Sequence, residues 1–169
     1  MRRAAIPRSI LSAAILLMLH GGLSIACHLC TGATWFMDDD MNARLEKEVP
    51  VCVPVEVTAT STNLVLGAAM IFAALGVLKL IPLARNVSIA LCMASLAIVL
   101  AYNSYAVIWL LPAQARIMEA EQQNMPPIFG AVTMGTAWGF VIVHVFMTLG
   151  VCGMAIHLLN RAPSRAAFA

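Results

Sequence analysis

Four long stretches without a charged residue constrain this chain more than any other feature. They cover residues 9–37, 57–78, 86–115 and 122–160. Each is longer than the roughly 20 apolar residues that an α-helix needs to cross a hydrocarbon core of about 30 Å. The composition agrees, since 62% of the residues are hydrophobic and 11% are charged, whereas about a quarter are charged in an ordinary soluble domain. The sequence therefore predicts an integral membrane protein.

An all-α fold is expected, because backbone groups in lipid must be satisfied internally and the stretches lack the alternation of barrel strands. We predict a single domain, residues 1–169, formed by an antiparallel bundle of four transmembrane helices with a structured first outer loop. The helices are expected at residues 10–33, 62–81, 87–111 and 130–158, with outer loops at 34–61 and 112–129. Met1–Ala26 also has the pattern of a signal peptide, but the uncharged stretch continues to residue 37, which favours an uncleaved first helix.

The distribution of basic residues predicts the orientation. Seven of the ten Lys and Arg residues lie on the side of the two termini, and three lie on the side of the outer loops. By the positive-inside rule, both termini face the cytoplasm of a plasma (inner) membrane, with an organelle membrane as the alternative. A net charge of +2 with scattered basic residues gives no basis for a nucleic-acid partner.

Both outer loops are expected to carry local structure. Asp38–Glu48 is typical of a short helix with an Asp cap, and the alternating Val residues with two prolines in Val49–Val57 are typical of extended chain. In the other loop, Pro112 favours the start of a new short helix that continues to Gln123. Both loops are therefore candidate lids over the bundle.

The sharpest local motif is Cys27-His28-Leu29-Cys30, at the outer end of the first predicted helix. In an oxidising compartment such a pair can exchange between dithiol and disulfide, and Cys52 in the same outer region could be the resolving thiol. The motif resembles the first redox pair of the quinone-reducing membrane disulfide oxidoreductases. That family has a second pair in the other outer loop, and residues 112–129 contain no cysteine. The alternative interpretation is packing, through the small residues Gly22, Ala26 and Cys30 at every fourth position.

Polar side chains in the outer half of the predicted bundle suggest a pocket that hydrogen-bonds a carbonyl of a quinone or of another lipid-soluble molecule. The alternative interpretation is that they form hydrogen bonds between helices. They are His20, Tyr102, Asn103, Tyr105, Thr133 and Thr136. A haem b is not expected, because His20 and His144 differ in predicted depth by roughly 9 Å and His28 lies too far out to meet another histidine. No metal site is expected, because the Cys27 and His28 side chains point in different directions on a helix. Cys92 and Cys152 are expected to be small apolar core residues.

Gly135 and Gly139 form a G-x-x-x-G pattern on the fourth predicted helix, which favours close helix packing. Because no predicted span carries an acidic residue and no catalytic set is complete, the first hypothesis is a non-catalytic accessory or interaction subunit. Its partners would be the lipid bilayer and other membrane subunits, or a second copy. One alternative is a thiol-disulfide redox protein that uses Cys27, Cys30 and Cys52 with a quinone. A second alternative is a carrier for a small solute.

Overall fold

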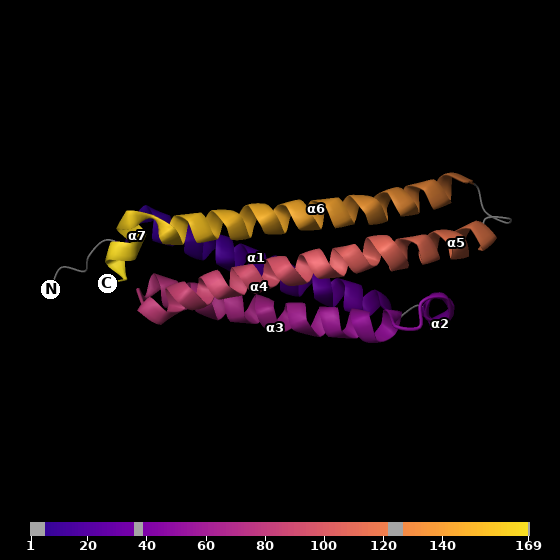
Figure 1. Cartoon of the computed structure of the whole chain (residues 1–169), viewed down its shortest axis with the longest axis horizontal. Coiled ribbons are helices and arrows are strands. Elements are labelled where there is room, and N and C mark those ends of the chain that lie inside the picture. The colour runs from indigo at the N-terminus through magenta and orange to yellow at the C-terminus, as the bar shows by residue number, and fades with distance from the viewer. Residues whose placement is uncertain (1–5, 36–38, 122–126, 169) are drawn as a thin grey trace.

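The computed structural model describes residues 6–35, 39–121 and 127–168, and every regular element in these ranges is helical. The elements are α1 (Arg8–Trp35), α2 (Asp39–Glu48), α3 (Cys52–Leu78), α4 (Pro82–Tyr105), a π-helical turn η1 (Ala106–Leu110), α5 (Leu111–Glu121), α6 (Pro127–Asn160) and α7 (Ala162–Ala167). Figure 1 shows that α1, α3, α4 with α5, and α6 run along the longest axis of the molecule. The prediction of four long apolar helices is confirmed.

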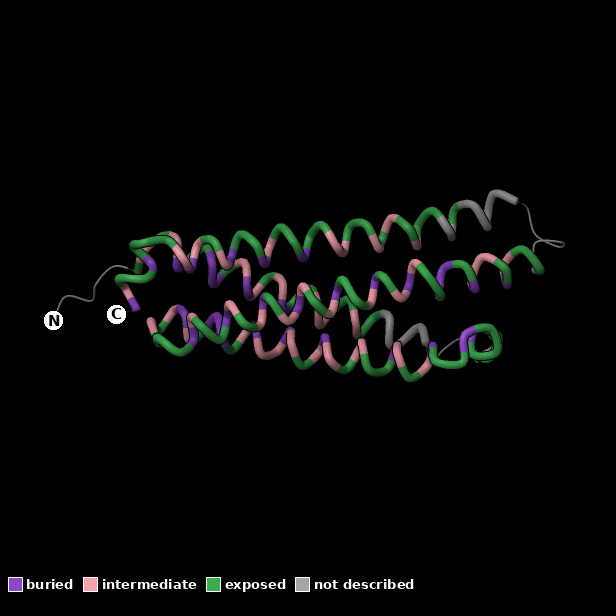
Figure 2. The backbone as a smooth tube through the Cα atoms, viewed as in Figure 1, coloured by how far each residue is buried: buried purple, intermediate pink, exposed green. Residues whose placement is uncertain are grey.

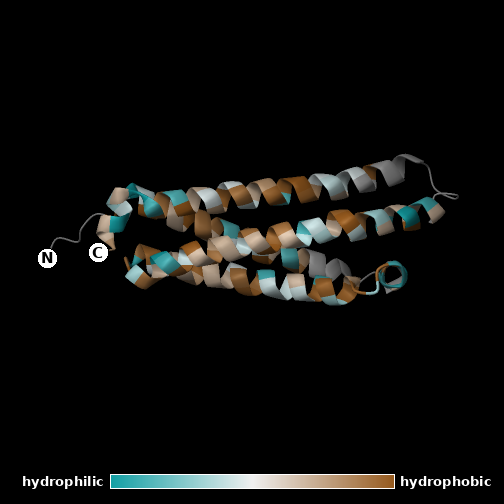
Figure 3. Cartoon of the chain, viewed as in Figure 1, coloured by the Kyte–Doolittle hydropathy of each residue, from teal (hydrophilic) through white to brown (hydrophobic). Residues whose placement is uncertain are grey.

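Each of the four long helical segments is long and apolar enough to cross a membrane, over Arg8–Cys30, Cys52–Leu78, Pro82–Ala120 and Gly135–Asn160. Their outward faces are exposed in Figure 2 and mostly hydrophobic in Figure 3. Phe72, Leu83 and Phe146 are each at least 70% exposed. Monomeric soluble proteins rarely present apolar surface on this scale, whereas a bundle surrounded by lipid requires it.

The backbones of α1 and α3 approach each other closely at two glycines. A Cβ atom on Gly21 would lie 2.5 Å from the carbonyl oxygen of Gly67, and a Cβ atom on Gly67 would lie 2.8 Å from the carbonyl oxygen of Gly21. Small residues at a helix interface allow this approach. A cluster of buried apolar side chains from α1, α3, α4 and α6 fills the bundle from this region toward α7.

The predicted extended chain at Val49–Val57 is wrong, because α3 begins at Cys52 and not near residue 62. Pro54 is the third residue of the helix, in the first turn, where no backbone N–H is needed as an intrahelical donor. The early start places Glu56, which belongs to the predicted outer loop 34–61, inside a long apolar helix.

Helices α4 and α5 are also continuous, where a break was predicted at Pro112. The π-helical turn η1 joins α4 to α5, and Leu111 has helical angles of φ −63° and ψ −41°. Proline lacks an N–H and clashes with the carbonyl four residues earlier, and a wider π turn at that place accommodates both effects.

The first outer region is structured as predicted, since α2 begins at Asp39 and ends at Glu48; Asp38 lies outside the described residues. Leu45 and Val49 pack with Cys52, Ala113 and other residues of η1 and α5 in a second apolar cluster. At the opposite end of the molecule, α7 contacts the start of α1, where the hydroxyls of Ser9 and Ser164 lie 2.7 Å apart (Figure 1).

Candidate functional site

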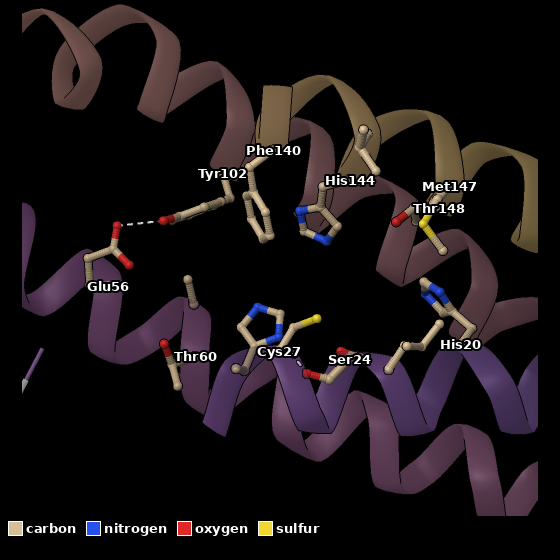
Figure 4. A pocket seen from close by; sticks show the side chains of 14 residues that line it. His20, Ser24, Cys27, Glu56, Thr60, Tyr102, Phe140, His144, Met147 and Thr148 are labelled. Atoms are coloured by element: carbon tan, nitrogen blue, oxygen red, sulfur yellow. Dashed lines mark hydrogen bonds between the residues drawn. The ribbon is translucent and has the colours of Figure 1, made fainter. Parts of the chain in front are cut away.

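A cavity of about 210 Å³ lies between α1, α3, α4 and α6, in the half of the bundle toward α2. Figure 4 shows that its polar side chains converge from all four helices. They are His20, Ser24, Cys27 and His28 of α1, Glu56 and Thr60 of α3, Tyr102 of α4, and His144 and Thr148 of α6. The remaining wall is apolar and includes Leu23, Ala59, Phe140, Val143 and Met147. Apolar walls with a few convergent polar groups are typical of small-molecule sites.

A carboxyl and a phenol meet at one end of the cavity. The hydroxyl of Tyr102 donates a hydrogen bond of 2.5 Å to Oε1 of Glu56. Glu56 is 8% exposed, so its carboxyl group is largely removed from solvent. A buried carboxyl is costly unless it is hydrogen-bonded, and intramembrane carboxyls mark functional sites by default.

Two histidines from different helices face each other across the cavity. The ring centroids of His28 and His144 are 6.2 Å apart, with an interplanar angle of 60°. The prediction that His28 lies too far out to meet another histidine is wrong. Helix α1 has 28 residues and α6 has 34, so counting positions from the helix ends does not give equal depths. The ring of Phe140 lies 5.8 Å from the ring of His144 and covers part of it.

The hydrogen bonds of His28 define which of its ring nitrogens is open to the cavity. Nδ1 lies 2.7 Å from the carbonyl oxygen of Ser24, which is its own helix backbone. A carbonyl can only accept, so Nδ1 carries the hydrogen, and in the neutral ring Nε2 is an acceptor. His28 therefore offers an acceptor to a ligand.

Two polar atoms of α6 line the cavity without a partner among the described residues. They are Nδ1 of His144 and Oγ1 of Thr148, and Thr148 is 1% exposed. Buried polar groups are nearly always hydrogen-bonded, because an unsatisfied one costs about 1–3 kcal/mol. A hydroxyl and a ring nitrogen that face a cavity unpartnered are therefore available to a ligand.

An apolar groove of about 560 Å³ runs along the outside of α3 and α4. Val51, Thr58 and Ile98 contribute to its lining, and Ala59 and Tyr102 line both the groove and the cavity. Tyr102 therefore forms part of the wall between an interior polar space and a surface that faces outward from the bundle.

The structure brings together some of the residues predicted to bind a ligand and separates others. His20 and Tyr102 line the cavity, and Tyr105 lines the outer groove. Asn103 is buried and donates to the carbonyl of Val99, while the exposed Thr136 donates to the carbonyl of Val132. The side chain of Thr133 lies outside the described residues.

None of the five cysteines, all of which are described, forms a disulfide in the structure. Cys27 and Cys30 are exposed, and Cys27 also lines the cavity. Cys52 is buried in the apolar cluster of α2, η1 and α5, so the structure does not bring the predicted resolving thiol to the Cys27/Cys30 motif. Among the described residues, no three side chains of His, Cys, Asp or Glu converge as a metal site would require.

The cavity also contains polar residues that are absent from the predicted ligand site, among them Glu56, His28, His144 and Thr148. Glu56 was assigned to a loop, although Pro54 in a first helical turn is a signal for an earlier helix start. His144 and Thr148 are four residues apart and therefore share a helix face, which the sequence alone does show. No known protein family, curated protein or solved structure matches this chain.

Proposed function

We propose that the four long helices cross a membrane and that the cavity binds the ring head group of a lipid-soluble quinone. Four apolar helices with exposed hydrophobic faces support the membrane location. The excess of Lys and Arg at the α7 end supports a cytoplasmic location for that end in a plasma membrane. The observation that carries the ligand proposal is the pair of unpartnered atoms, His144 Nδ1 and Thr148 Oγ1, beside the Glu56–Tyr102 hydrogen bond in one cavity.

The polar groups of the cavity match both redox forms of a quinone. The hydroxyl of Thr148 and a protonated ring nitrogen of His144 are donors for the carbonyl oxygens of the oxidised form. Nε2 of His28 and the carboxyl of Glu56 are acceptors for the hydroxyls of the reduced form. The ring of Phe140 offers an apolar face against which a flat ring can stack.

The size of the cavity favours a single ring. About 210 Å³ is below the roughly 300–1,000 Å³ of sites that enclose a whole drug-sized molecule. An isoprenoid tail therefore needs a route to lipid. The groove between α3 and α4 supplies one, because it is apolar and shares Ala59 and Tyr102 with the cavity.

Quinone binding is tested with the purified chain in lipid nanodiscs, by quenching of tryptophan fluorescence during titration with decylubiquinone. Thr148→Val should weaken binding about fivefold, the loss of one hydrogen bond of about 1 kcal/mol. Thr136→Val is the matched control, since Thr136 is on the same helix, exposed, and bonded to its own backbone. Equal affinities for both variants and the unmodified chain would refute the site.

The tail route is tested separately from the head group. Ala101→Trp fills the groove, which Ala101 lines, from a position that is not part of the cavity lining. It should weaken binding of decylubiquinone while leaving binding of a tail-less benzoquinone unchanged. Val65→Trp, at an exposed position on α3, is the control for adding a large side chain. If both quinones lose affinity equally, the groove is not the route of the tail.

A second candidate function is that of an accessory subunit that packs against a partner helix through α6. Gly135, Gly139, Gly150 and Gly153 fall within an arc of about 60° on this helix, taking about 100° per residue. A Cβ atom on any of them would meet nothing within 4 Å, so none of them is used inside the bundle. The same holds for Gly22 of the Gly22/Ala26 pattern on α1. Small residues on an outer face permit close approach of another helix.

The accessory hypothesis predicts that Gly139→Ile abolishes an association without unfolding the chain. The measurement is energy transfer between differently labelled copies in liposomes, together with chemical cross-linking in native membranes. Leu149→Ile, at another exposed position of α6, is the control. Unchanged energy transfer and unchanged cross-links in Gly139→Ile would exclude this face as the contact.

A further inference from the structure

Basic side chains gather at the α7 end of the molecule, where no described residue is acidic. The described basic residues at this end are Arg8, Lys79, Arg85, Arg161 and Arg165. Each lies within five residues of an end of one of the four apolar spans. All eight Asp and Glu residues of the chain fall in 38–56 and 119–121, toward the α2 end (Figure 1). The charge of the α7 end is therefore not neutralised by acidic side chains.

Three of these arginines meet at the C-terminal end of α6, and we call them the arginine cluster. Nη2 of Arg85 donates to Oδ1 of Asn160, and Nε of Arg165 donates to the carbonyl oxygen of Asn160, each at 2.7 Å. Arg161 follows Asn160 directly, and its Nε donates to Nε2 of the exposed His157 at 3.4 Å. Guanidinium groups from α4 and from the start of α7 are thus held around one helix terminus.

The end of α6 does not balance these charges. A helix C-terminus is equivalent to about half a negative charge, whereas the arginine cluster carries three positive charges. In the exposed side chains of Arg161 and Arg165, only Nε is hydrogen-bonded to another described residue. A guanidinium group has five N–H donors, so both Nη groups of each keep their donors for a further acceptor. Donors in this fork geometry bind phosphate bidentately.

The arginine cluster lies where an apolar span ends. The fourth span ends at Asn160, directly before Arg161. Helix α7 is then held against α1, since the hydroxyls of Ser9 and Ser164 lie 2.7 Å apart (Figure 1). Arg165, next to Ser164, is therefore kept near the start of α1 and the end of α6. In a membrane, this is the level at which lipid phosphates lie.

We propose that the arginine cluster binds the phosphate of an anionic phospholipid in the cytoplasmic leaflet. Basic pockets between transmembrane helices on the cytoplasmic side are typical sites for anionic headgroups. Leu83 of α4 and Met154 of α6 are 70% and 57% exposed. They offer apolar surface to acyl chains, which a free phosphate ion would not use. The inference rests on the proposed membrane location of the helices and is independent of the quinone site.

The test measures binding of phosphatidylglycerol to the full chain in non-ionic detergent micelles by native mass spectrometry. Phosphatidylcholine with the same acyl chains has the phosphate but no net charge, and it should bind at least about tenfold more weakly. Loss of one positive charge beside the phosphate should weaken phosphatidylglycerol binding about fivefold. The double variant Arg161→Gln/Arg165→Gln should therefore weaken it about 25-fold. Arg116→Gln, which removes an exposed arginine at the opposite end, is the control and should leave the affinity unchanged.

Three results would overturn the inference. The first is equal affinity for the two lipids. The second is an equal loss of affinity in Arg116→Gln and in the double variant, since the net charge and not the cluster would then attract the lipid. The third is displacement of phosphatidylglycerol by inorganic phosphate at matched ionic strength, which would identify a soluble anion as the ligand. If the double variant does not fold, Arg161→Gln alone decides, with an expected fivefold loss.

Flotation with phosphatidylcholine liposomes tests the membrane location separately. A chain that floats with these liposomes and shows no preference for phosphatidylglycerol would keep the membrane location and refute the lipid site. A chain that does not float would refute both. Quinone binding, followed by tryptophan quenching, is a third measurement whose outcome does not affect this inference.

Discussion

Substitution of Gly21 by Ala is the most direct test of the packing that holds α1 against α3. The added Cβ atom would lie 2.5 Å from the carbonyl oxygen of Gly67 and 3.0 Å from Cγ1 of Ile71. Carbon and oxygen do not approach to 2.5 Å without overlap, and a backbone carbonyl cannot rotate away as a side chain can. The two helices must therefore separate locally, which reduces the dispersion contacts along their interface. Overpacking of this kind costs about 1–3 kcal/mol.

Gly22→Ala is the matched control, because Gly22 is the next residue and an added Cβ atom there meets nothing within 4 Å. Both substitutions change helix propensity by the same amount, up to about 1 kcal/mol in favour of Ala. The difference between the two variants therefore isolates the packing term. We expect Gly21→Ala to be less stable than Gly22→Ala by about 1–3 kcal/mol. The assay is reversible unfolding in mixed micelles followed by far-ultraviolet circular dichroism.

Equal free energies of unfolding for the two alanine variants would show that the contact between Gly21 and Gly67 does not exist in solution. Gly67→Ala adds a second check, as its Cβ atom would lie 2.8 Å from the carbonyl of Gly21. The double variant should cost less than the sum of the single variants, because the first substitution already separates the helices.

Three further predictions concern polar contacts. Thr148→Val should raise the free energy of unfolding of the ligand-free chain by about 1 kcal/mol, because it removes an unpartnered buried hydroxyl; a loss of stability in the same micelle assay would mean that the hydroxyl has a partner. Arg85→Met should lower the free energy of unfolding by about 1.5–3 kcal/mol, because Arg85 donates to the carbonyl of Leu159 and to Oδ1 of Asn160 at the end of α6. An unchanged unfolding midpoint would show that these hydrogen bonds do not stabilise the bundle. Arg116→Ala should change the free energy of unfolding by less than about 1 kcal/mol, because both side chains of its ion pair with Glu48 are exposed. A larger loss of stability would show that the position of α2 depends on this ion pair.

The long helices were predictable because their signal is the length of uncharged sequence, which depends little on packing. Their ends were less predictable. Prolines mark breaks in most helices, but Pro54 lies in a first turn and Pro112 follows a π turn, and both positions tolerate proline. Ala106 and Leu110 of η1 share an apolar cluster with Leu45 of α2, and such packing is not a local property of the sequence.

The site was predictable only in part for a related reason. Which residues share a cavity depends on helix rotation, and an error of one residue turns a side chain by about 100°. The small-residue pattern on α1 illustrates this, since Gly22 is exposed while Gly21 makes the close contact. Depth is equally sensitive, because His28 and His144 meet although they are unequally far from the ends of their helices.

The inner face of α6 carries His144, Thr148 and Cys152 at every fourth position, directly opposite its glycine face. Leucine at these positions would fill the bundle without unsatisfied groups, so stability alone does not account for the polar residues. Thr148 and His144 retain unpartnered atoms at the cavity, whereas Cys152 is buried in the apolar core cluster. The two polar residues at the cavity therefore have free hydrogen-bonding capacity. That capacity suits a face on which His144 and Thr148 bind a ligand.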